Sequence, residues 1–423
     1  MTRQLVCILA TTALVLLTPA LRAQQPLTWD QVKARFEASN PALKADADNV
    51  DEMRAEEITA YLRPNPQIGV TADGTQIAPN NGVWQPLAGT FVVPSISYLH
   101  ERDHKRELRL KSAQEGTRIS ESQHADLQRN LEFALRSAFV QTLEAKAVLK
   151  VARADIDYYD NIIAISQDRY KAGDIAQIDL DRIELLRVQY EAELQTAIVS
   201  LRTAKIQLLQ LLNEQTPAAQ FDVTGPFDFS ETLQPLEQFR QIALANRPDL
   251  QAAIQTIQQS ETNHKLAIAN GSTDPTFGAW YTWNSSTNNP NADQTLGLSV
   301  NIPLRIFDRN QGEKQRTQAD IDRAREASEA ARAQVFSDVD TAYAEVASNI
   351  ALLKPYKDQY NAQALRVRDT VTYAYEHGGA SLMDFLNAQS DYRQVQLAYE
   401  QLIGDYLTAA AQLNLAVGRE VIQ

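Results

Sequence analysis

Residues 170–180, YKAGDIAQIDL, return in degenerate form as YEHGGASLMDF at residues 375–385. The offset of 205 residues (375 − 170) places the Tyr, Gly and Asp of the two stretches in register. Further upstream, Asn40-Pro41 is echoed by Asn246-Arg247-Pro248, with an offset of 207 residues between the prolines (248 − 41). A period of this length is too long for a solenoid unit. The sequence therefore predicts a chain built from two copies of one domain-sized half.

The N-terminus has the pattern of a secretory signal peptide. Arg3 precedes an apolar run over residues 5–17, and Leu21-Arg22-Ala23 offers a small residue at the cleavage point. The only cysteine, Cys7, lies inside this segment, so the mature chain is expected to hold no disulfide. Residues 1–23 are predicted to be removed on export.

The charge balance and the hydropathy pattern narrow the classes of partner. The chain carries a formal net charge of −13, and loss of Arg3 and Arg22 would leave it more acidic still. Binding to phosphates requires an excess of Lys and Arg, so nucleic acid is excluded as the expected partner. After the signal, no stretch approaches the roughly 20 apolar residues of a transmembrane helix. A membrane-spanning part would therefore have to consist of strands.

Each half shows the same order of elements: a helix, two strands, a very long helix and a shorter helix. The predicted boundaries are 24–214 for the first repeat, 215–233 for a linker, 234–418 for the second repeat and 419–423 for a C-terminal tail. The stretch 101–213 has no proline and has Gly173 at an expected helix end, so it predicts helices at 101–171 and 175–213. A helix at 28–62 is expected to stop at Arg63-Pro64, and the repeat predicts helices at 236–270, 309–377 and 381–417 in the second half.

The lengths of these helices predict a tall antiparallel coiled-coil bundle. The predicted helix 101–171 has about the combined length of the helices 28–62 and 175–213, which would therefore stack end to end along it. Pro355 lies inside the predicted helix 309–377 and is expected to kink it, because proline cannot donate to the preceding turn.

Three segments alternate between apolar and polar residues with the period of a strand, and a fourth, at about residues 89–98, alternates poorly. They are centred on residues 67–73, 89–98, 276–283 and 296–304, and Trp280 and Trp283 would suit a membrane interface. A small soluble sheet packed on the helices is one interpretation. The other is a membrane sheet, which requires oligomerisation because four strands cannot close a barrel and open edges are not tolerated in lipid.

The two repeats and the motif Val300-Asn301-Ile302-Pro303-Leu304, followed by Asp308 and Gly312, resemble the TolC-type outer-membrane efflux family. A weaker copy of the motif begins at Phe91, and the resemblance spans essentially all of the mature chain. It implies a mainly α protein in which an α-helical barrel stands in the periplasm. Four strands per chain would contribute to a twelve-stranded transmembrane β-barrel shared by a homotrimer.

The resemblance also implies a function. The chain would be the outer-membrane exit duct of a tripartite efflux or type I secretion system, with passive conduction through a gated tunnel. Its partners would be a periplasmic adaptor protein, an inner-membrane pump and the lipid bilayer, and it would be neither an enzyme nor a cofactor protein. The alternative left open by the residues is an exported periplasmic coiled-coil adaptor or structural protein.

By the same resemblance, the two helical turns would close the tunnel. Asp179 and Tyr375 would belong to a latch between helices, and Asp384 would form a ring of carboxylates that favours cations. Asn387 stands where the best-known member has a second aspartate, so the ring would be less charged. A second interpretation makes Asp384 a first-turn acid that complements the helix dipole. The implied adaptor contacts at the tips are Gly173, Gly378, Gly379 and Ser381.

One motif suggests a different chemistry. Residues 100–104 fit the pattern H-E-x-x-H, in which His100 and His104 would share one helix face and bind zinc while Glu101 acts as base. No third ligand is singled out, and the segment continues into Lys105-Arg106. We therefore expect a charged first turn of a helix, with neither a metal site nor catalytic residues.

Overall fold

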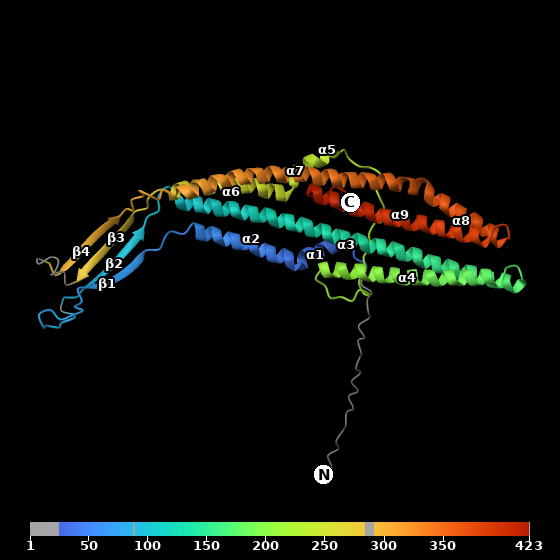
Figure 1. The fold of residues 1–423 in the computed structure, drawn as a ribbon, viewed down its shortest axis with the longest axis horizontal. Helices are drawn as coiled ribbons and strands as arrows, with labels where there is room; N and C mark the ends of the chain where they lie inside the picture. Colours follow the sequence, from blue (N-terminus) through green and yellow to red (C-terminus); the bar gives the residue numbers. More distant parts are fainter. Residues whose placement is uncertain (1–24, 88, 284–291, 423) are drawn as a thin grey trace, which may run out of the picture.

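The computed structural model describes residues 25–87, 89–283 and 292–422, so the predicted signal peptide lies outside the described residues. The chain forms an elongated body of long helices with a four-stranded sheet at one end and two helical turns at the other (Figure 1). Among the described residues, no helix combines the length and the apolar character needed to cross a membrane.

The first half is organised around one very long helix. Its elements are α1 Trp29–Ser39, α2 Pro41–Ala60, β1 Gln67–Asp73, β2 Phe91–Leu99, α3 Lys105–Ala172 and α4 Gln177–Leu211. The 68 residues of α3 span about 100 Å at 1.5 Å per residue. Both α2 and α4 pack against α3, the former toward the sheet and the latter toward the turns (Figure 1). The predicted end-to-end stacking is confirmed.

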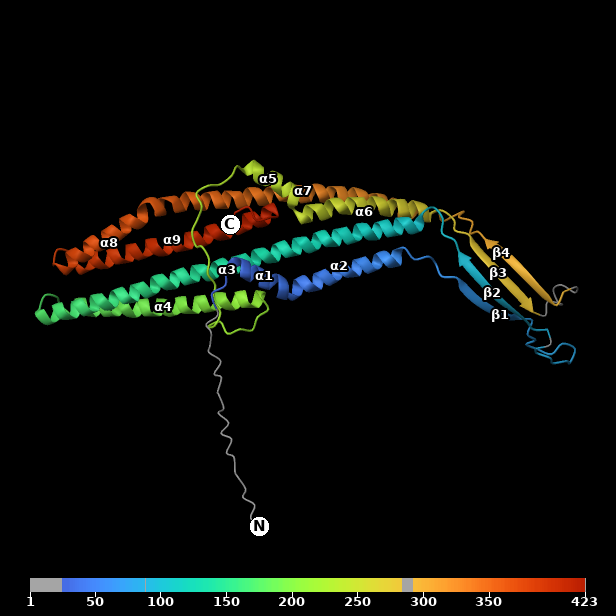
Figure 2. The ribbon, with the colours of Figure 1, turned by 180° about the vertical axis from the view of Figure 1, so that it is seen from behind.

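The second half repeats this order. Its elements are α5 Leu236–Asn246, α6 Pro248–Asn270, β3 Thr276–Trp283, β4 Gln294–Asn301, α7 Gln311–Pro355, α8 Asn361–Glu376 and α9 Leu382–Val417. The predicted kink at Pro355 is confirmed, because a π-helical turn, Tyr356–Tyr360, follows it and joins α7 to α8. Seen from behind, α6 and α9 lie along the same side of α3 (Figure 2).

The helices form a wall rather than a closed bundle. Next to the sheet, α2 packs on α3, α3 on α6 and α6 on α7, and toward the turns α4 packs on α3, α3 on α9 and α9 on α8. In the described part of the chain, α2 and α4 therefore lie at one edge of the wall and α7 and α8 at the other. The wall has two lateral edges that this chain leaves open.

The predicted single helices 28–62 and 236–270 are wrong, because each is broken before a proline. Pro41 is the first residue of α2 and Pro248 the first of α6. A proline disfavours helical geometry in the residue before it, whereas its own fixed φ suits the first helical position. The repeated prolines therefore mark a helix break and not only a similarity between the halves.

Each break is fastened to the last helix of its own half. In the first half, the Asn40 side chain accepts hydrogen bonds from the N–H groups of Ala42 and Leu43 and donates one to the Leu211 carbonyl at the end of α4. In the second half, Arg247 donates at 3.3 Å to the Ala416 carbonyl near the end of α9. The two halves thus use different side chains for one structural task.

Arg247 is also the centre of a buried ion cluster. Its side chain is 4% exposed and bonds Asp249 at 2.9 and 2.5 Å and Asp338 of α7 at 2.7 Å. Burial alone would raise the pKa of Asp249, but the hydrogen bonds from Arg247 outweigh it, so this pKa lies below its ordinary value. The cluster joins α6 to α7 at the middle of the wall.

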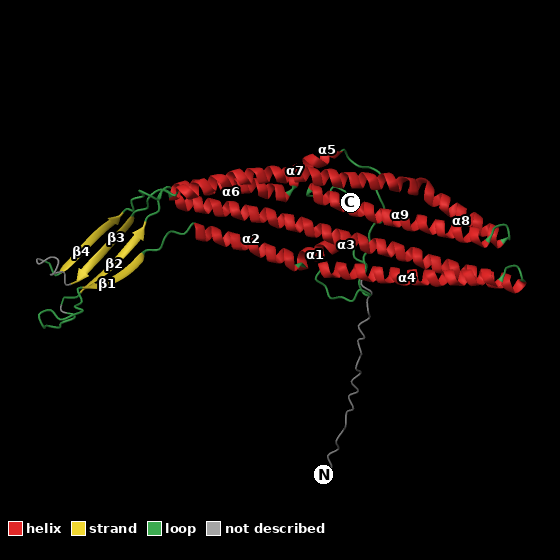
Figure 3. Ribbon diagram, viewed as in Figure 1, coloured by secondary structure: helices red, strands yellow, loops and turns green. Residues whose placement is uncertain are grey.

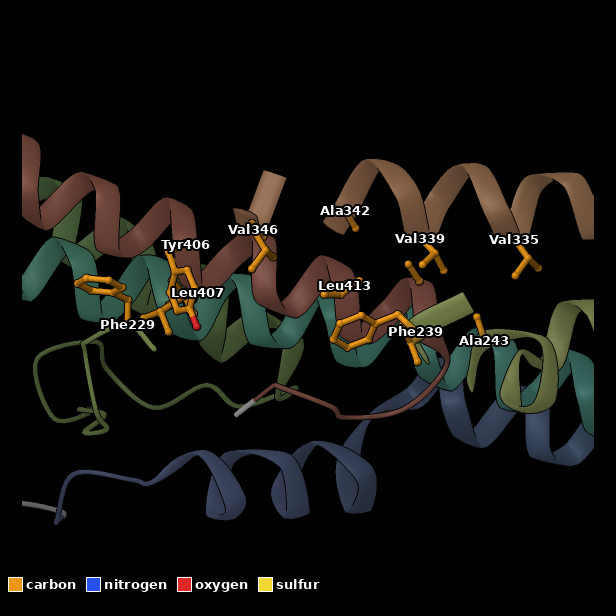
Figure 4. Close-up of a cluster of buried hydrophobic side chains, with 14 of the residues drawn as sticks. Phe229, Phe239, Ala243, Val335, Val339, Ala342, Val346, Tyr406, Leu407 and Leu413 are labelled. Carbon is orange, nitrogen blue, oxygen red and sulfur yellow. The ribbon is translucent and has the colours of Figure 1, made fainter. Parts of the chain in front are cut away.

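Two apolar clusters hold the middle of the wall together. In one, α5, α7 and α9 meet around Phe239, Val335, Val339 and Leu413 (Figure 4). The other joins α1, α3 and α4. The predicted linker 215–233 contributes to both, since Phe221 lies in the second cluster and Phe229 in the first. The linker is therefore packed into the body.

The sheet extends beyond the helices, and in the described residues no helix covers either of its faces (Figure 3). The strand order is β1-β2-β3-β4 with antiparallel neighbours. Ile68, Ile96, Ala279 and Leu298 form one apolar row across all four strands, and Ile68 is 81% exposed. The last strand ends at Asn301 instead of continuing to residue 304, where Pro303 removes a backbone donor.

The Arg247 cluster leads to a stability prediction. Arg247→Gln would leave Asp249 and Asp338 without their buried counter-charge, so we expect the free energy of unfolding to fall by about 3–5 kcal/mol. Denaturant unfolding followed by circular dichroism measures this change. The control is Arg54→Gln, which removes only an exposed pair with Asp51 and Glu121 and should leave stability unchanged.

The same cluster predicts a pH dependence. Because the pKa of Asp249 is depressed in the folded state, its contribution is present above its ordinary pKa, near 4, and is lost as the pH falls through the folded value. The difference in the free energy of unfolding between wild type and Arg247→Gln should therefore become smaller below about pH 4. A difference that stays constant from pH 7 to pH 3 would contradict this assignment.

Candidate functional site at the helical turns

Two tight turns lie together at the end of the body opposite the sheet (Figures 1 and 2). One joins α3 to α4 through Gly173, and the other joins α8 to α9 through residues 377–381. Gly173 has φ 84° and Gly378 has φ 76°, a left-handed geometry that glycine adopts without strain. Gly379 does not share this geometry. Gly173 and Gly378 are thus required by the turns themselves.

An aromatic cluster joins the two turns within the chain. Tyr375, at the end of α8, is 5% exposed and stacks on Phe385 of α9 with ring centroids 4.8 Å apart. The guanidinium of Arg169, at the end of α3, lies 5.0 Å from the Tyr375 ring centroid and donates to the Tyr375 carbonyl at 2.9 Å. One hairpin therefore holds the other through Arg169 and Tyr375.

The structure does not bring the predicted latch residues together within one chain. Asp179 is half-buried in the first turn of α4, and in the described residues no hydrogen bond joins it to Tyr375. The Tyr375 hydroxyl is buried without a hydrogen-bond partner in this part of the chain. The latch between Asp179 and Tyr375 stays a prediction, and the contacts that Tyr375 makes are to α3 and α9.

Asp384 caps its own helix. Its carboxylate accepts from the Ser381 hydroxyl at 2.7 Å and from the Ser381 N–H at 3.3 Å, while the Asp384 N–H donates to the Ser381 hydroxyl at 3.1 Å. The equivalent cap in the first repeat is missing, because Ala176 stands in the place of Ser381. Ser381 thus has a structural role at the tip. Asp384 and Asn387 both remain exposed, and the ring of carboxylates stays a prediction.

An ion cluster above the turns was missed by sequence reasoning. Arg393 of α9 bonds Asp155 of α3 at 3.0 Å and also bonds Glu193 of α4. Its guanidinium lies 5.0 Å from the ring centroid of Tyr190. Burial raises the pKa of Asp155, and Arg393 opposes this effect. Because these residues lie far apart in the sequence, no local pattern could have revealed that they connect three helices.

The H-E-x-x-H motif does not form the geometry of a zinc site. The long helix begins at Lys105, four residues later than predicted, and His104 precedes it with φ 56° and an 88% exposed side chain. Glu101 accepts hydrogen bonds from both terminal nitrogens of Arg109, at 2.5 and 2.8 Å. His100 and His104 therefore do not share a helix face, and Glu101 is engaged in an ion pair.

Comparisons with known proteins agree with this architecture. The family model for outer membrane efflux proteins matches residues 239–419. The cobalt-zinc-cadmium resistance protein CzcC of Cupriavidus metallidurans is 22% identical to this chain, over 94% of this chain and 91% of its own length.

Two solved structures have the same fold. The crystal structure of CusC, described in connection with transmembrane channel formation, has a TM-score of 0.76 at 16% identity and covers 92% of each chain. The outer membrane protein VceC of Vibrio cholerae has a TM-score of 0.74 at 16% identity, covering 93% of this chain and 96% of its own.

The cluster around Arg393 leads to a prediction about the mobility of the turns. Arg393→Gln would leave Asp155 and Glu193 half-buried without their shared counter-charge, so α4 and α9 should separate more readily from α3. We expect faster amide hydrogen exchange at the tip ends of α4 and α9. Arg187→Gln is the matched control, because Arg187 bonds Asp160 and Glu191 and so joins α3 to α4 alone. Equal exchange at α9 in the two variants would contradict the proposed role of Arg393.

Proposed function

Because the chain belongs to the outer membrane efflux protein family, we propose that three copies form the outer-membrane exit duct of a tripartite efflux or secretion system. Proteins of this family are located in the outer membrane, and the same location follows for this chain. Cargo would pass by conduction without a catalytic step. An inner-membrane pump would supply the energy, and a periplasmic adaptor would connect the pump to the helical turns.

The observation that carries this proposal is the uncovered sheet. In the described residues, the outer edges of β1 and β4 have no strand partner. Unpaired backbone groups are costly in lipid, so a sheet of this kind enters a membrane only when its edges are paired. The apolar row of Ile68, Ile96, Ala279 and Leu298, in which all but the partly buried Ala279 are exposed, supplies a lipid-facing surface. Pairing β4 of one copy with β1 of the next would give the edge backbone groups their hydrogen-bond partners and would leave the apolar row facing lipid.

The open edges of the helical wall support the same assembly. On α4, an apolar stripe recurs every seven residues and remains exposed, and it consists of Ile178, Leu185, Ala192, Val199 and Ile206. On α8, at the other edge, Val367 and Tyr373 are exposed. A heptad stripe is the pattern of a helix that packs against another helix. We infer that α4 of one copy packs on α8 of its neighbour, so that the wall closes into a tunnel in register with the sheet.

Three copies would bring three copies of each turn to the end of this tunnel. Asp384 is exposed there, and its capping bonds hold the carboxylate in one place. Three carboxylates around an axis attract cations. This agrees with the cobalt, zinc and cadmium in the name of the relative CzcC.

The assembly leads to a direct prediction. Protein extracted from outer membranes in mild detergent should have the mass of three chains, and it should conduct ions after reconstitution into planar bilayers. Leu185→Asp, which places a charge on the α4 stripe, should shift the mass toward one chain. Glu184→Asp, at an exposed neighbouring position, is the matched control. A monomer that is recovered from the periplasm without detergent would support the soluble adaptor alternative instead.

The carboxylate at the constriction leads to a second prediction. Asp384→Asn keeps the size of the side chain and removes its charge, so the preference for cations over anions should fall while the trimer remains intact. The reversal potential in a salt gradient measures this selectivity. The control Asp174→Asn changes an exposed acid in the other turn. If selectivity is unchanged in Asp384→Asn, then Asp384 acts only as a helix cap.

A further inference from the structure

A cavity of about 380 Å³ lies at the middle of the helical wall, far from the turns and from the sheet. It is formed where α1, α3 and the end of α9 meet. Its apolar wall is contributed mainly by Trp29, Phe133 and Leu415. A volume of this size is typical of sites for small organic molecules.

The charge of this cavity is opposite to the charge of the chain. Its lining contains four cationic side chains, Lys33, Arg129, Arg136 and Arg419, and two acidic ones, Glu132 and Glu420. The lining itself therefore has two positive charges in excess, one of which is offset by Asp126, the partner of Arg129 outside the lining, whereas the chain as a whole carries −13. A local potential of this sign favours an anion.

Arg419 is exposed, and among the three partly buried cations of the lining one is free to bind a ligand. Lys33 is paired with Glu132 at 2.9 Å, and Arg129 bonds Asp126 and, at 2.6 Å, the Leu415 carbonyl. Arg136 differs, because among the described residues its guanidinium has neither a hydrogen-bond acceptor nor an ion-pair partner. It lies 4.5 Å from the ring centroid of Trp29, which holds its orientation.

The surroundings of Arg136 leave its hydrogen-bond donors available to a ligand. Burial lowers the pKa of the guanidinium, and the charges of Glu420 and Asp30, neither of which bonds it, offset this effect only in part. A guanidinium carries five N–H donors in a planar fork that fits a carboxylate with two parallel hydrogen bonds. A ligand that supplies such a carboxylate would satisfy the donors of Arg136 and neutralise part of the excess charge.

We propose that this cavity binds a small organic anion in which a carboxylate is joined to a flat apolar body. The carboxylate would bond Arg136, and the apolar body would lie against Phe133 and Leu415. The apolar wall selects against small inorganic anions, and the excess positive charge selects against neutral molecules of the same shape. The site is separate from Asp384 and from the turns, so it is not part of the proposed conduction gate.

The experiment is a calorimetric titration of the detergent-solubilised protein with 1-naphthoate as probe. We expect saturable binding of 1-naphthoate, and affinities at least about tenfold weaker for neutral 1-naphthylmethanol and for inorganic phosphate, each of which lacks one of the two features. Arg136→Gln should weaken 1-naphthoate binding by at least about tenfold, because a hydrogen bond to a charged group is lost. Arg136→Lys should retain part of the affinity.

Two further variants complete the test. Arg118→Gln removes the same charge from an exposed position on the same helix and should leave binding unchanged. Ala125→Trp fills the cavity from an exposed position without altering any charge, so it should abolish binding even if Arg136→Gln fails to fold. The proposal is overturned if the wild type does not bind 1-naphthoate, or if Arg136→Gln or Ala125→Trp binds it as the wild type does. Binding is measured without conduction, so this result is independent of the channel proposal.

Discussion

The architecture of this protein depends on two kinds of unpaired edge, one in the sheet and one in the helical wall. The backbone groups along the outer edges of β1 and β4 find no partner in the described chain, and the helical wall likewise ends in α4 on one side and α8 on the other. A backbone edge in lipid and an apolar helix face in water are both unfavourable when left open. One operation, the addition of neighbouring copies around an axis, removes both penalties together.

The middle of the wall gives the rigidity that such an assembly needs. There the helix that precedes each strand pair is broken, and the break is fastened to the last helix of its half by Asn40 or by Arg247. The linker adds Phe221 to one core and Phe229 to the other. The two halves therefore behave as one body between the sheet and the turns, and the anion cavity at Arg136 lies in this same region.

The sequence predicted the features that depend on local pattern. The repeat, the period-two strands and the glycine turns were all placed within a few residues, and the kink after Pro355 was expected from one residue. The breaks at Pro41 and Pro248 were missed, because the helical pattern continues on both sides of each proline. Tyr170 and Tyr375 occupy equivalent repeat positions, yet Tyr170 is exposed and Tyr375 is buried against Phe385. Contacts such as Arg393 with Asp155 depend on the tertiary arrangement, which neither repeat encodes locally.

Disulfide trapping between β1 and β4 tests the central claim most directly. The only native cysteine, Cys7, lies in the predicted signal peptide, so Val70→Cys and Leu298→Cys would supply the only thiols of the mature chain. Within one chain, β1 and β4 are separated by two strands, or about 14 Å, which is too far for a disulfide. Oxidation of outer membranes should therefore give covalent trimers of the double variant and none of either single variant. Monomers alone, across a scan of neighbouring positions on both strands, would contradict the shared sheet.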